Sequence, residues 1–297
     1  MKILILGCRG NLGTQLMKVF GADKKYEVNG FDQGDFNLLE PLSLTEKISE
    51  LKPEIIINAT AYNAVDKCEE SGEEFELAKK INGTAVEYLA AAALKAGALF
   101  IHYSTDYVFP GDYKDGYKED DRPQPINNYG RSKLLGEEAV IKKGGGESAG
   151  DKQEGAGLKY YLIRTSKLFG PRGDSPVSKP SFFDLMIKLA GEKDELEIVD
   201  DEASAFTYTP DLAAATKALI ENRAPLGLYH LVNTTPATWY EAALELFKIT
   251  GNNVKIKAVG SDKFPRPAKR PEYSYLLNTK TKPLRDYREA LRDYLKK

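Results

Sequence analysis

The sequence predicts an α/β fold in which helices cover both faces of a doubly wound parallel sheet. Short apolar runs alternate with amphipathic helical patterns over residues 1–165. The runs are apolar at nearly every position, which is typical of strands buried on both faces. A glycine-containing turn follows the first run directly and opens the first helical pattern. Alternating β and α units of this kind favour a parallel sheet with right-handed crossovers.

The elements of this first half follow from apolar runs bounded by turn residues or by the start of a helical pattern. We expect strands over residues 1–6, 26–31, 54–60, 98–105 and 158–165, and helices over 11–20, 44–51, 73–96 and 132–142.

The second half has a looser rhythm. A glycine-rich segment at 144–157 lacks large apolar side chains and is expected to be a surface loop, since it follows a helix and precedes a strand. Beyond it we expect helices over residues 182–190, 211–221, 238–249 and about 284–295, and strands over 196–201, 227–232 and 254–259.

Composition excludes several classes of protein. The 297 residues carry 42 basic and 44 acidic side chains, a formal net charge of −2, so nucleic acid is not an expected partner. No apolar run approaches the roughly 18 residues that a membrane-spanning helix requires. The two cysteines, Cys8 and Cys68, cannot build a disulfide framework, and a reducing, cytoplasmic setting fits them best.

Three glycines open the first helix. Glycine at this turn lets backbone N–H groups approach a pyrophosphate, and the helix N-terminus adds a partial positive charge. The spacing alone is a weak signal, but the strand–turn–helix context is typical of a Rossmann-type dinucleotide site. A plain tight β–α turn is the alternative. The candidate cofactor-binding residues of this loop are Gly7, Arg9, Gly10, Asn11, Leu12 and Gly13.

An acidic residue, Asp32, follows the second expected strand. A carboxylate there can accept hydrogen bonds from the adenosine ribose hydroxyls and repels a 2′-phosphate, which favours NADH. Two alternatives stay open, namely Asp32 as a plain turn residue and Arg9 as the partner of the 2′-phosphate of NADPH. We therefore expect NADH or NADPH, with NADH favoured by Asp32.

The most specific pattern pairs Tyr129 with Lys133, four residues further along at a helix start. Side chains at this spacing project from one helix face. A free tyrosine has a pKa of about 10, and we expect the Lys133 ammonium to lower it. Thr105 ends the fourth expected strand, at the edge where open α/β sheets bind ligands. We interpret these three residues as catalytic, with a surface Tyr–Lys pair as the alternative.

These motifs predict two interleaved lobes. We expect residues 1–165 to form the dinucleotide-binding domain and 166–297 to form mainly a substrate-binding lobe. The strands expected near 198 and 230 return to the first sheet, so the first domain recovers segments from about 195–235.

The motif segments resemble the extended short-chain dehydrogenase/reductases, and within them the dTDP-4-dehydrorhamnose reductase family. The matching segments span nearly the whole chain, among them 58–69, 102–111, 129–137 and 164–170. The resemblance implies NAD(P)H-dependent reduction of the 4-keto group of a deoxysugar nucleotide, giving dTDP-L-rhamnose for cell-surface polysaccharide. It implies that Thr105, Tyr129 and Lys133 are catalytic, that Ala59, Ala61 and Tyr62 line the cofactor path, and that Val65, Asp66, Asp106, Lys167 and Arg270 lie near the sugar nucleotide.

The chain departs from the family pattern at the expected sugar site. The family usually has Trp where this chain has Lys167. Its D-Q-x-G-x-P-T stretch here carries Glu202, Ser204 and Phe206 in place of Gln, Gly and Pro. The departures bear on the sugar and on turnover rather than on the cofactor. The resemblance also allows a homodimer around magnesium, but the sequence offers no firm ligand set, and we expect no metal residues.

Two other classes of protein remain as alternatives. A non-catalytic regulatory subunit, like that of methionine adenosyltransferase, resembles the same family, although the intact Thr105, Tyr129 and Lys133 argue against it. A sugar-nucleotide dehydratase would carry Asp-Glu after the strand-end Thr, whereas Tyr107 follows Asp106 here.

Several further polar residues have structural explanations. We expect His102 and His230 to be core histidines, Trp239 to pack, and the acidic run 200–202 to be a solvated loop rather than a cation site. In the basic segment near the C-terminus we expect Arg270 to clamp a diphosphate, since guanidinium pairs bidentately with phosphate oxygens.

Overall fold

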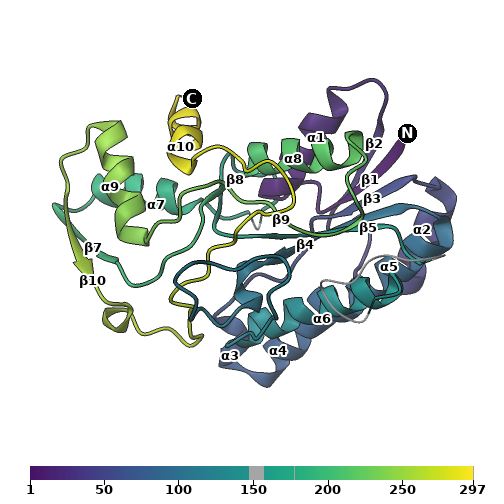
Figure 1. Cartoon of the computed structure of the whole chain (residues 1–297), viewed down its shortest axis with the longest axis horizontal. Coiled ribbons are helices and arrows are strands. Elements are labelled where there is room, and N and C mark those ends of the chain that lie inside the picture. The colour runs from purple at the N-terminus through teal and green to yellow at the C-terminus, as the bar shows by residue number, and fades with distance from the viewer. Residues whose placement is uncertain (147–156, 177, 297) are drawn as a thin grey trace.

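Six parallel strands form the central sheet of the computed structural model (Figure 1). The structure describes residues 1–146, 157–176 and 178–296, apart from the side chains of residues 41 and 42. The strand order is β2-β1-β3-β4-β5-β9. The sheet first grows from β1 to β2 on one side and then from β3 onward on the other, so the strand order switches between β1 and β3. Ligands of open α/β sheets bind beyond the carboxyl ends of the strands at such a point. The predicted parallel α/β fold is therefore confirmed. The strands are β1 (Lys2–Leu6), β2 (Glu27–Phe31), β3 (Ile55–Asn58), β4 (Leu99–Thr105), β5 (Tyr160–Thr165) and β9 (Gly227–His230).

Helices cover both faces of this sheet (Figure 1). On β1, Leu4 and Leu6 enter one apolar core and Ile3 and Ile5 enter the other, and all four are fully buried. This burial on both faces explains why residues 3–6 of the strand are all apolar. Helices α1 (Asn11–Gly21) and α8 (Thr209–Glu221) complete the Ile3 core, while α2 (Pro41–Leu51), α5 (Ala85–Ala96) and α6 (Asn128–Lys143) complete the Leu4 core.

The long helix predicted over 73–96 is present in three parts. Helix α4 (Gly72–Lys79) passes through a single π-helical turn (Lys80–Thr84) into α5. Such turns inside α-helices are frequent at functional sites. A short helix that the sequence did not reveal, α3 (Lys67–Glu70), precedes them.

A second lobe, on the left of Figure 1, has an apolar core of its own. The core includes Phe169, Phe183, Phe206 and Leu246, all of them buried. The lobe contains two two-stranded sheets, β10 paired with β7 and β6 paired with β8. Its elements are β6 (Leu168–Phe169), α7 (Phe182–Ala190), β7 (Glu195–Val199), β8 (Thr207–Tyr208), α9 (Trp239–Thr250), β10 (Lys255–Val259) and α10 (Tyr287–Leu295).

Of the two strands expected to return to the first sheet, only one does so. β9 pairs with β5 at the edge of the central sheet, which confirms the prediction for the strand near 230. The prediction for the strand near 198 is wrong, because β7 pairs with β10 in the second lobe. Leu196 and Ile198 enter that lobe's core, and an apolar strand pattern does not specify which sheet receives the strand.

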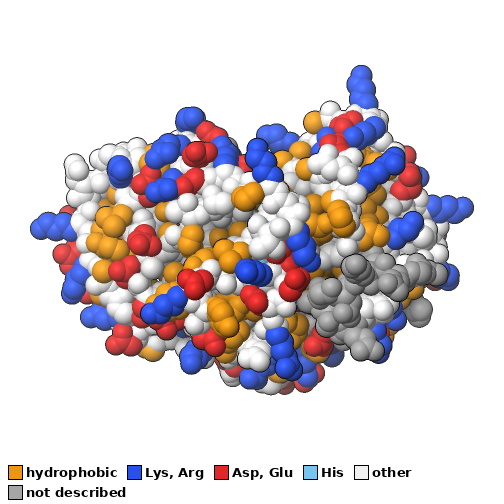
Figure 2. Space-filling model, in the orientation of Figure 1, with side chains coloured by type: hydrophobic (Ala, Val, Ile, Leu, Met, Phe, Trp, Pro, Cys, Tyr) orange, Lys and Arg blue, Asp and Glu red, His pale blue; other side chains and the backbone are white. Residues whose placement is uncertain are grey.

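The remaining predictions concern loops and surfaces. Most of the loop predicted at 144–157 lies outside the described residues. No helix among the described residues is long and apolar enough to cross a membrane. On the face shown in Figure 2, acidic and basic side chains are interspersed, in keeping with the nearly balanced charge.

Candidate active site

The glycine loop packs backbone against backbone at the carboxyl end of β1. Gly7 has a φ of +77°, a conformation that favours glycine. A Cβ added to Gly13 would lie 1.9 Å from the carbonyl oxygen of Gly7, so only glycine fits. No side chain caps α1, because the residue before it is Gly10. This cradle fits the pyrophosphate of a dinucleotide, whose charge the helix N-terminus favours.

The polar side chains of the glycine loop, Arg9 and Asn11, have different surroundings. Arg9 is exposed. Asn11 accepts a hydrogen bond at Oδ1 from the Gly173 amide over 2.9 Å, and the Arg9 carbonyl accepts one from the Ser175 amide at 2.9 Å. The segment after β6 therefore contacts the glycine loop across a large distance in sequence. Leu12 is buried in the core beneath α1.

Asp32 is buried at the end of β2 and holds the loop in place. Its Oδ2 accepts a hydrogen bond from the Arg9 amide at 2.9 Å, and its Oδ1 accepts one from the Gln33 amide at 2.8 Å. The carboxylate thus organises the turn in addition to any contact with a ribose. The turn interpretation and the ribose interpretation are compatible with each other in this geometry.

The residues after β3 are fixed by a buried asparagine of the π-helical turn. Ala59 lies against Gly7: a Cβ added to Gly7 would lie 3.0 Å from the Ala59 carbonyl oxygen. Asn82 accepts at Oδ1 from the Tyr62 amide over 2.8 Å and donates to the Tyr62 carbonyl over 2.9 Å. It also donates to Ser132 Oγ on α6 at 2.9 Å. Asn82 therefore connects the expected cofactor path with the helix that carries Lys133, while Ala61 is exposed.

Helix α6 begins four residues earlier than predicted, which places Tyr129 in its first turn. Asn127 caps the helix by accepting a hydrogen bond from the Gly130 amide at 2.8 Å. A Cβ on Gly130 would meet the Tyr107 carbonyl oxygen at 2.1 Å, so the close approach of this turn to Tyr107 requires glycine. The Tyr107 and Tyr129 rings pack edge to face with centroids 5.9 Å apart. Tyr129 is thereby held next to the end of β4.

The protonation states at this site differ from the expectation. Burial raises the pKa of Tyr129 above its ordinary value, and a hydrogen bond with Thr105 lowers it only in part. The expected lowering by Lys133 is wrong in this structure, because Lys133 Nζ donates to the Tyr103 carbonyl at 2.7 Å. Burial lowers the pKa of Lys133 itself to about 8, against the opposing charge of Glu137. The tyrosine is thus a protonated acid at neutral pH.

A buried carboxyl adjoins the catalytic candidates. Thr105 donates from Oγ1 to Asp106 Oδ1 over 3.0 Å. Asp106 Oδ2 accepts hydrogen bonds from Ser204 Oγ at 3.0 Å and from Ser274 Oγ at 2.7 Å. Burial raises the pKa of Asp106, and these hydrogen bonds oppose the shift. Two distant segments, which carry Ser204 and Ser274, therefore converge on the residue after Thr105.

An ion pair joins the cofactor side to the C-terminal segment. Arg270 donates from two nitrogens to the two Asp66 carboxylate oxygens, at 2.6 and 2.7 Å. The Arg270 hydrogen bond lowers the pKa of Asp66 below its usual range. Asn127 donates to the Lys269 carbonyl at 2.9 Å, which ties the same segment to the start of α6. Val65, next to Asp66, is half-buried. The predicted diphosphate clamp is thus anchored beside α6.

The other candidate sites have structural roles. His102 and His230 are fully buried in β4 and β9, and burial holds the pKa of each well below its ordinary value. Both predictions of core histidines are therefore confirmed. Asp200 accepts a hydrogen bond from Thr238 Oγ1 and Asp201 accepts from Ser261. Among the described residues no group of three or more His, Cys, Asp and Glu side chains is placed to hold a metal ion.

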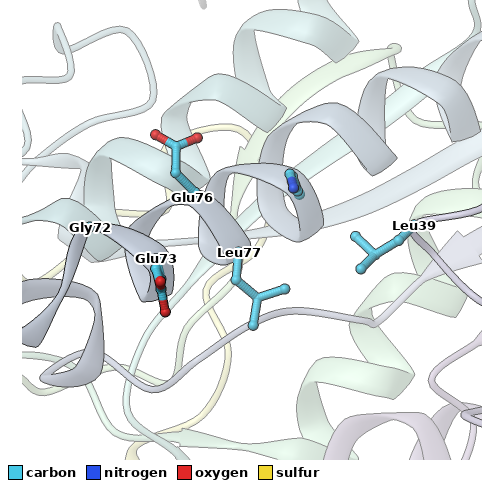
Figure 3. Close-up of a pocket in the computed structure, with 6 residues that line it drawn as sticks. Leu39, Gly72, Glu73, Glu76 and Leu77 are labelled. Atoms are coloured by element: carbon cyan, nitrogen blue, oxygen red, sulfur yellow. The ribbon is translucent and has the colours of Figure 1, made fainter.

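One surface depression is separate from the catalytic candidates. It has a volume of about 590 Å³ and lies between the loop after β2 and α4 (Figure 3). Leu39 faces α4 from the loop, while Glu73 and Glu76 line the helix side. Its charged lining is mixed, with Lys80 beside Glu73 and Glu76. The polar groups of the catalytic candidates converge elsewhere, at the carboxyl edge of the sheet.

The comparisons with known proteins decide the family. The family model of the RmlD substrate binding domain matches residues 1–297. The chain belongs to this family. Among curated relatives, the dTDP-4-dehydrorhamnose reductase of Escherichia coli strain K12 is 36% identical over 93% of this chain and 89% of that protein. The spore coat polysaccharide biosynthesis protein SpsK of Bacillus subtilis strain 168 is 34% identical over 99% of this chain and 96% of its own.

Solved structures agree with this family membership. A dTDP-4-dehydrorhamnose reductase from Clostridium acetobutylicum superposes with a TM-score of 0.88 at 36% identity, covering 100% of this chain and 99% of that one. The dTDP-4-dehydrorhamnose reductase of Bacillus anthracis, solved in complex with NADP, also has a TM-score of 0.88, at 31% identity over 99% and 98% of the two chains. The family resemblance seen in the sequence is confirmed.

Sequence reasoning missed residues that position others. Asn82, Ser204 and Ser274 each hold a candidate site residue through a buried side-chain contact. The break in the helical pattern at Asn82-Gly83 was the available signal for the first. Ser204 stood out only as a departure from the family pattern, and Ser274 carried no signal, because the two reach Asp106 from 98 and 168 residues away.

Proposed function

We propose that this protein reduces the 4-keto group of dTDP-4-dehydro-L-rhamnose to give dTDP-L-rhamnose, with NADH or NADPH as reductant. The observation that carries the proposal is the convergence of Thr105, Tyr129 and Lys133 at the carboxyl edge of the sheet, beside a glycine cradle that fits a dinucleotide. Membership of the RmlD family favours this reductase over a non-catalytic regulatory subunit.

The bound reduced nicotinamide supplies a hydride to the carbonyl carbon. The chain's own residues handle the proton. Tyr129 gives the proton of its hydroxyl to the oxygen of the reduced carbonyl, since its raised pKa keeps it protonated at neutral pH. In the proposed step the ammonium of Lys133, which donates to the Tyr103 carbonyl in this structure, turns toward the phenolate left behind, since both side chains project from one face of α6. Thr105, which lies within hydrogen-bonding reach of Tyr129, orients the carbonyl.

The coenzyme preference is a separate part of the proposal. Asp32 lies buried at the end of β2, and a carboxylate there repels a 2′-phosphate, so NADH is the preferred coenzyme. The 31%-identical relative solved with NADP and the exposed Arg9 keep NADPH as a working coenzyme. The substitution Asp32→Ser, which removes the charge, should shift the ratio of kcat/KM values toward NADPH. An unchanged ratio would exclude Asp32 as the determinant.

We also propose a cytoplasmic setting and a homodimer. Both cysteines are free thiols, which fits a reducing, cytoplasmic location. A homodimer is proposed from the family resemblance, and sedimentation of the protein with and without Mg²⁺ tests both the dimer and any dependence on the metal.

The direct test is oxidation of NADH and NADPH in the presence of dTDP-4-keto-6-deoxy-L-mannose, generated in situ by the upstream dehydratase and epimerase. We expect coenzyme oxidation that depends on the ketosugar, with dTDP-L-rhamnose as the product. Binding of the coenzyme without any such oxidation would reject the reductase and support the non-catalytic subunit.

A further inference from the structure

An ammonium group at the edge of the site has no part in the mechanism above. Lys167 lies two residues beyond the end of β5, and β5 pairs with β4, whose last residue is Thr105. Its φ is +36°, in the left-handed region that lysine rarely adopts. A strained residue of this kind persists only where its surroundings hold it in place. The direction of the Lys167 side chain is therefore set by the fold.

The side chain ends in an aromatic enclosure. Lys167 Nζ lies 3.9 Å from the ring centroid of Trp239 and 5.0 Å from that of Phe206. The two rings pack edge to face with centroids 5.4 Å apart. Aromatic faces attract an ammonium group and replace part of its hydration. Trp239, which we expected only to pack, thus also fixes the charge of Lys167.

The Lys167 ammonium has more N–H donors than it has hydrogen-bond acceptors within the enclosure. Nζ donates to the Glu202 carbonyl at 3.2 Å. An ammonium has three N–H donors and this contact uses one of them. The Glu202 carboxylate is itself engaged by Arg266 and by the Trp239 indole N–H. Neither of these contacts takes up a donor of Lys167.

The enclosure and the catalytic candidates share Asp106. The Asp106 and Glu202 charges raise the pKa of Lys167, Arg266 lowers it, and burial lowers it most, to about 7. Asp106 in turn accepts hydrogen bonds from Thr105 and Ser204. Four departures from the family pattern are thus linked, since Lys167 contacts Glu202 and Phe206, and Ser204 contacts Asp106, whose charge acts on Lys167.

We propose that Lys167 is a specificity-determining residue that donates a hydrogen bond from its ammonium to an oxygen substituent of the substrate's sugar. The inference rests on the proposed function, because it assumes that a sugar nucleotide binds at this edge. Its ligand class is a sugar that presents a hydroxyl oxygen toward the end of β5. An aromatic residue at this position would offer the sugar an apolar face to stack on. Lysine instead offers it a hydrogen-bond donor.

The first test measures binding, independently of turnover. Isothermal titration compares dTDP-L-rhamnose with dTDP in the wild type, Lys167→Met, Lys167→Arg and the control Lys248→Met, which changes an exposed lysine of α9. We expect Lys167→Met to weaken binding of dTDP-L-rhamnose about tenfold, the effect of one charged hydrogen bond, with dTDP unaffected. Lys167→Arg and Lys248→Met should stay within about threefold of the wild type.

The second test measures turnover of dTDP-4-keto-6-deoxy-L-mannose. Lys167→Met should raise KM for the ketosugar about tenfold while kcat and the coenzyme Kd stay near wild type. Unchanged dTDP-L-rhamnose affinity and KM would overturn the inference, as would a loss of kcat alone. A wild type that shows the binding difference without turnover would reject the proposed reduction and leave this inference standing.

A pH series covers the case in which Lys167→Met does not fold. The charged groups that face Lys167 are Asp106, Glu202 and Arg266. In the wild type the preference for dTDP-L-rhamnose over dTDP should decline as pH rises through about 7, because the ammonium then loses its proton. In Lys167→Arg, which keeps all three neighbours and its charge, the preference should be constant. The same pH profile in both proteins would overturn the inference.

Discussion

The proposed cofactor side and the proposed sugar side of this site are built in different ways. At the cofactor side, Gly7, Gly10 and Gly13 lie within a single strand–turn–helix unit, and their shape follows from local backbone geometry. At the sugar side, Lys167, Glu202 and Trp239 come from three separate segments and meet only through the packing of the second lobe. The difference shows how one chain can retain a common coenzyme cradle while its substrate contacts change.

Tyr129 lies where the two sides meet, and its removal should have the largest effect. Tyr129→Phe deletes the proton donor and should lower kcat about a thousandfold or more while the coenzyme and dTDP-L-rhamnose still bind. Coenzyme oxidation assays measure kcat, and isothermal titration measures binding of the coenzyme and dTDP-L-rhamnose. The control is Tyr88→Phe, at an exposed tyrosine of α5. Turnover retained in Tyr129→Phe would remove the tyrosine from the chemistry.

Gly13→Ala should damage the cofactor side alone. The added methyl group meets the Gly7 carbonyl 1.9 Å away, so the cradle must open. We expect the coenzyme Kd to rise about a hundredfold, with binding of dTDP little changed, because a misplaced turn loses several backbone hydrogen bonds at once. Gly21→Ala, where a Cβ meets nothing within 4 Å, is the matched control. Equal losses for both ligands would show that the two sides are not independent.

The pH dependence of turnover should follow Lys133. Burial lowers its pKa to about 8, so the ammonium is present below that pH and is lost above it. Since the ammonium stabilises the Tyr129 phenolate, kcat should fall about tenfold per pH unit above about 8. Comparing kcat profiles for the wild type and Lys133→Arg, whose guanidinium stays charged, isolates the effect. A falling profile that persists in Lys133→Arg would assign the titration to another group.

The smallest effect is expected at the ion pair that connects the two sides. Asp66 holds Arg270 through a bidentate contact, but the Asp66 side chain is 37% exposed, so solvent screens the pair. Asp66→Asn should raise KM for the sugar nucleotide less than tenfold and lower the melting temperature only slightly. Asp115→Asn, at an exposed loop residue, serves as control. A change in the coenzyme Kd instead would place the pair on the cofactor side.

The predictable part of the structure followed local patterns. Residues 3–6 of β1 are all apolar because both faces of the strand are covered, and the helix over 182–190 begins and ends where its pattern predicts. The strand near 198 was misplaced because its apolar residues suit either sheet. The helix at Tyr129 was predicted to start too late, since the Asn127 cap and the Gly130–Tyr107 contact depend on a neighbouring loop.

The sequence by itself determined the fold class, the glycine cradle and the family, because each depends on residues that are close together along the chain. Only the tertiary structure decided that Asp106 is buried beneath Ser204 and Ser274, that Tyr129 is a protonated acid, and that Lys167 is enclosed by aromatic rings. Burial and the approach of distant side chains set these properties, since desolvation depends on everything that packs around a charge.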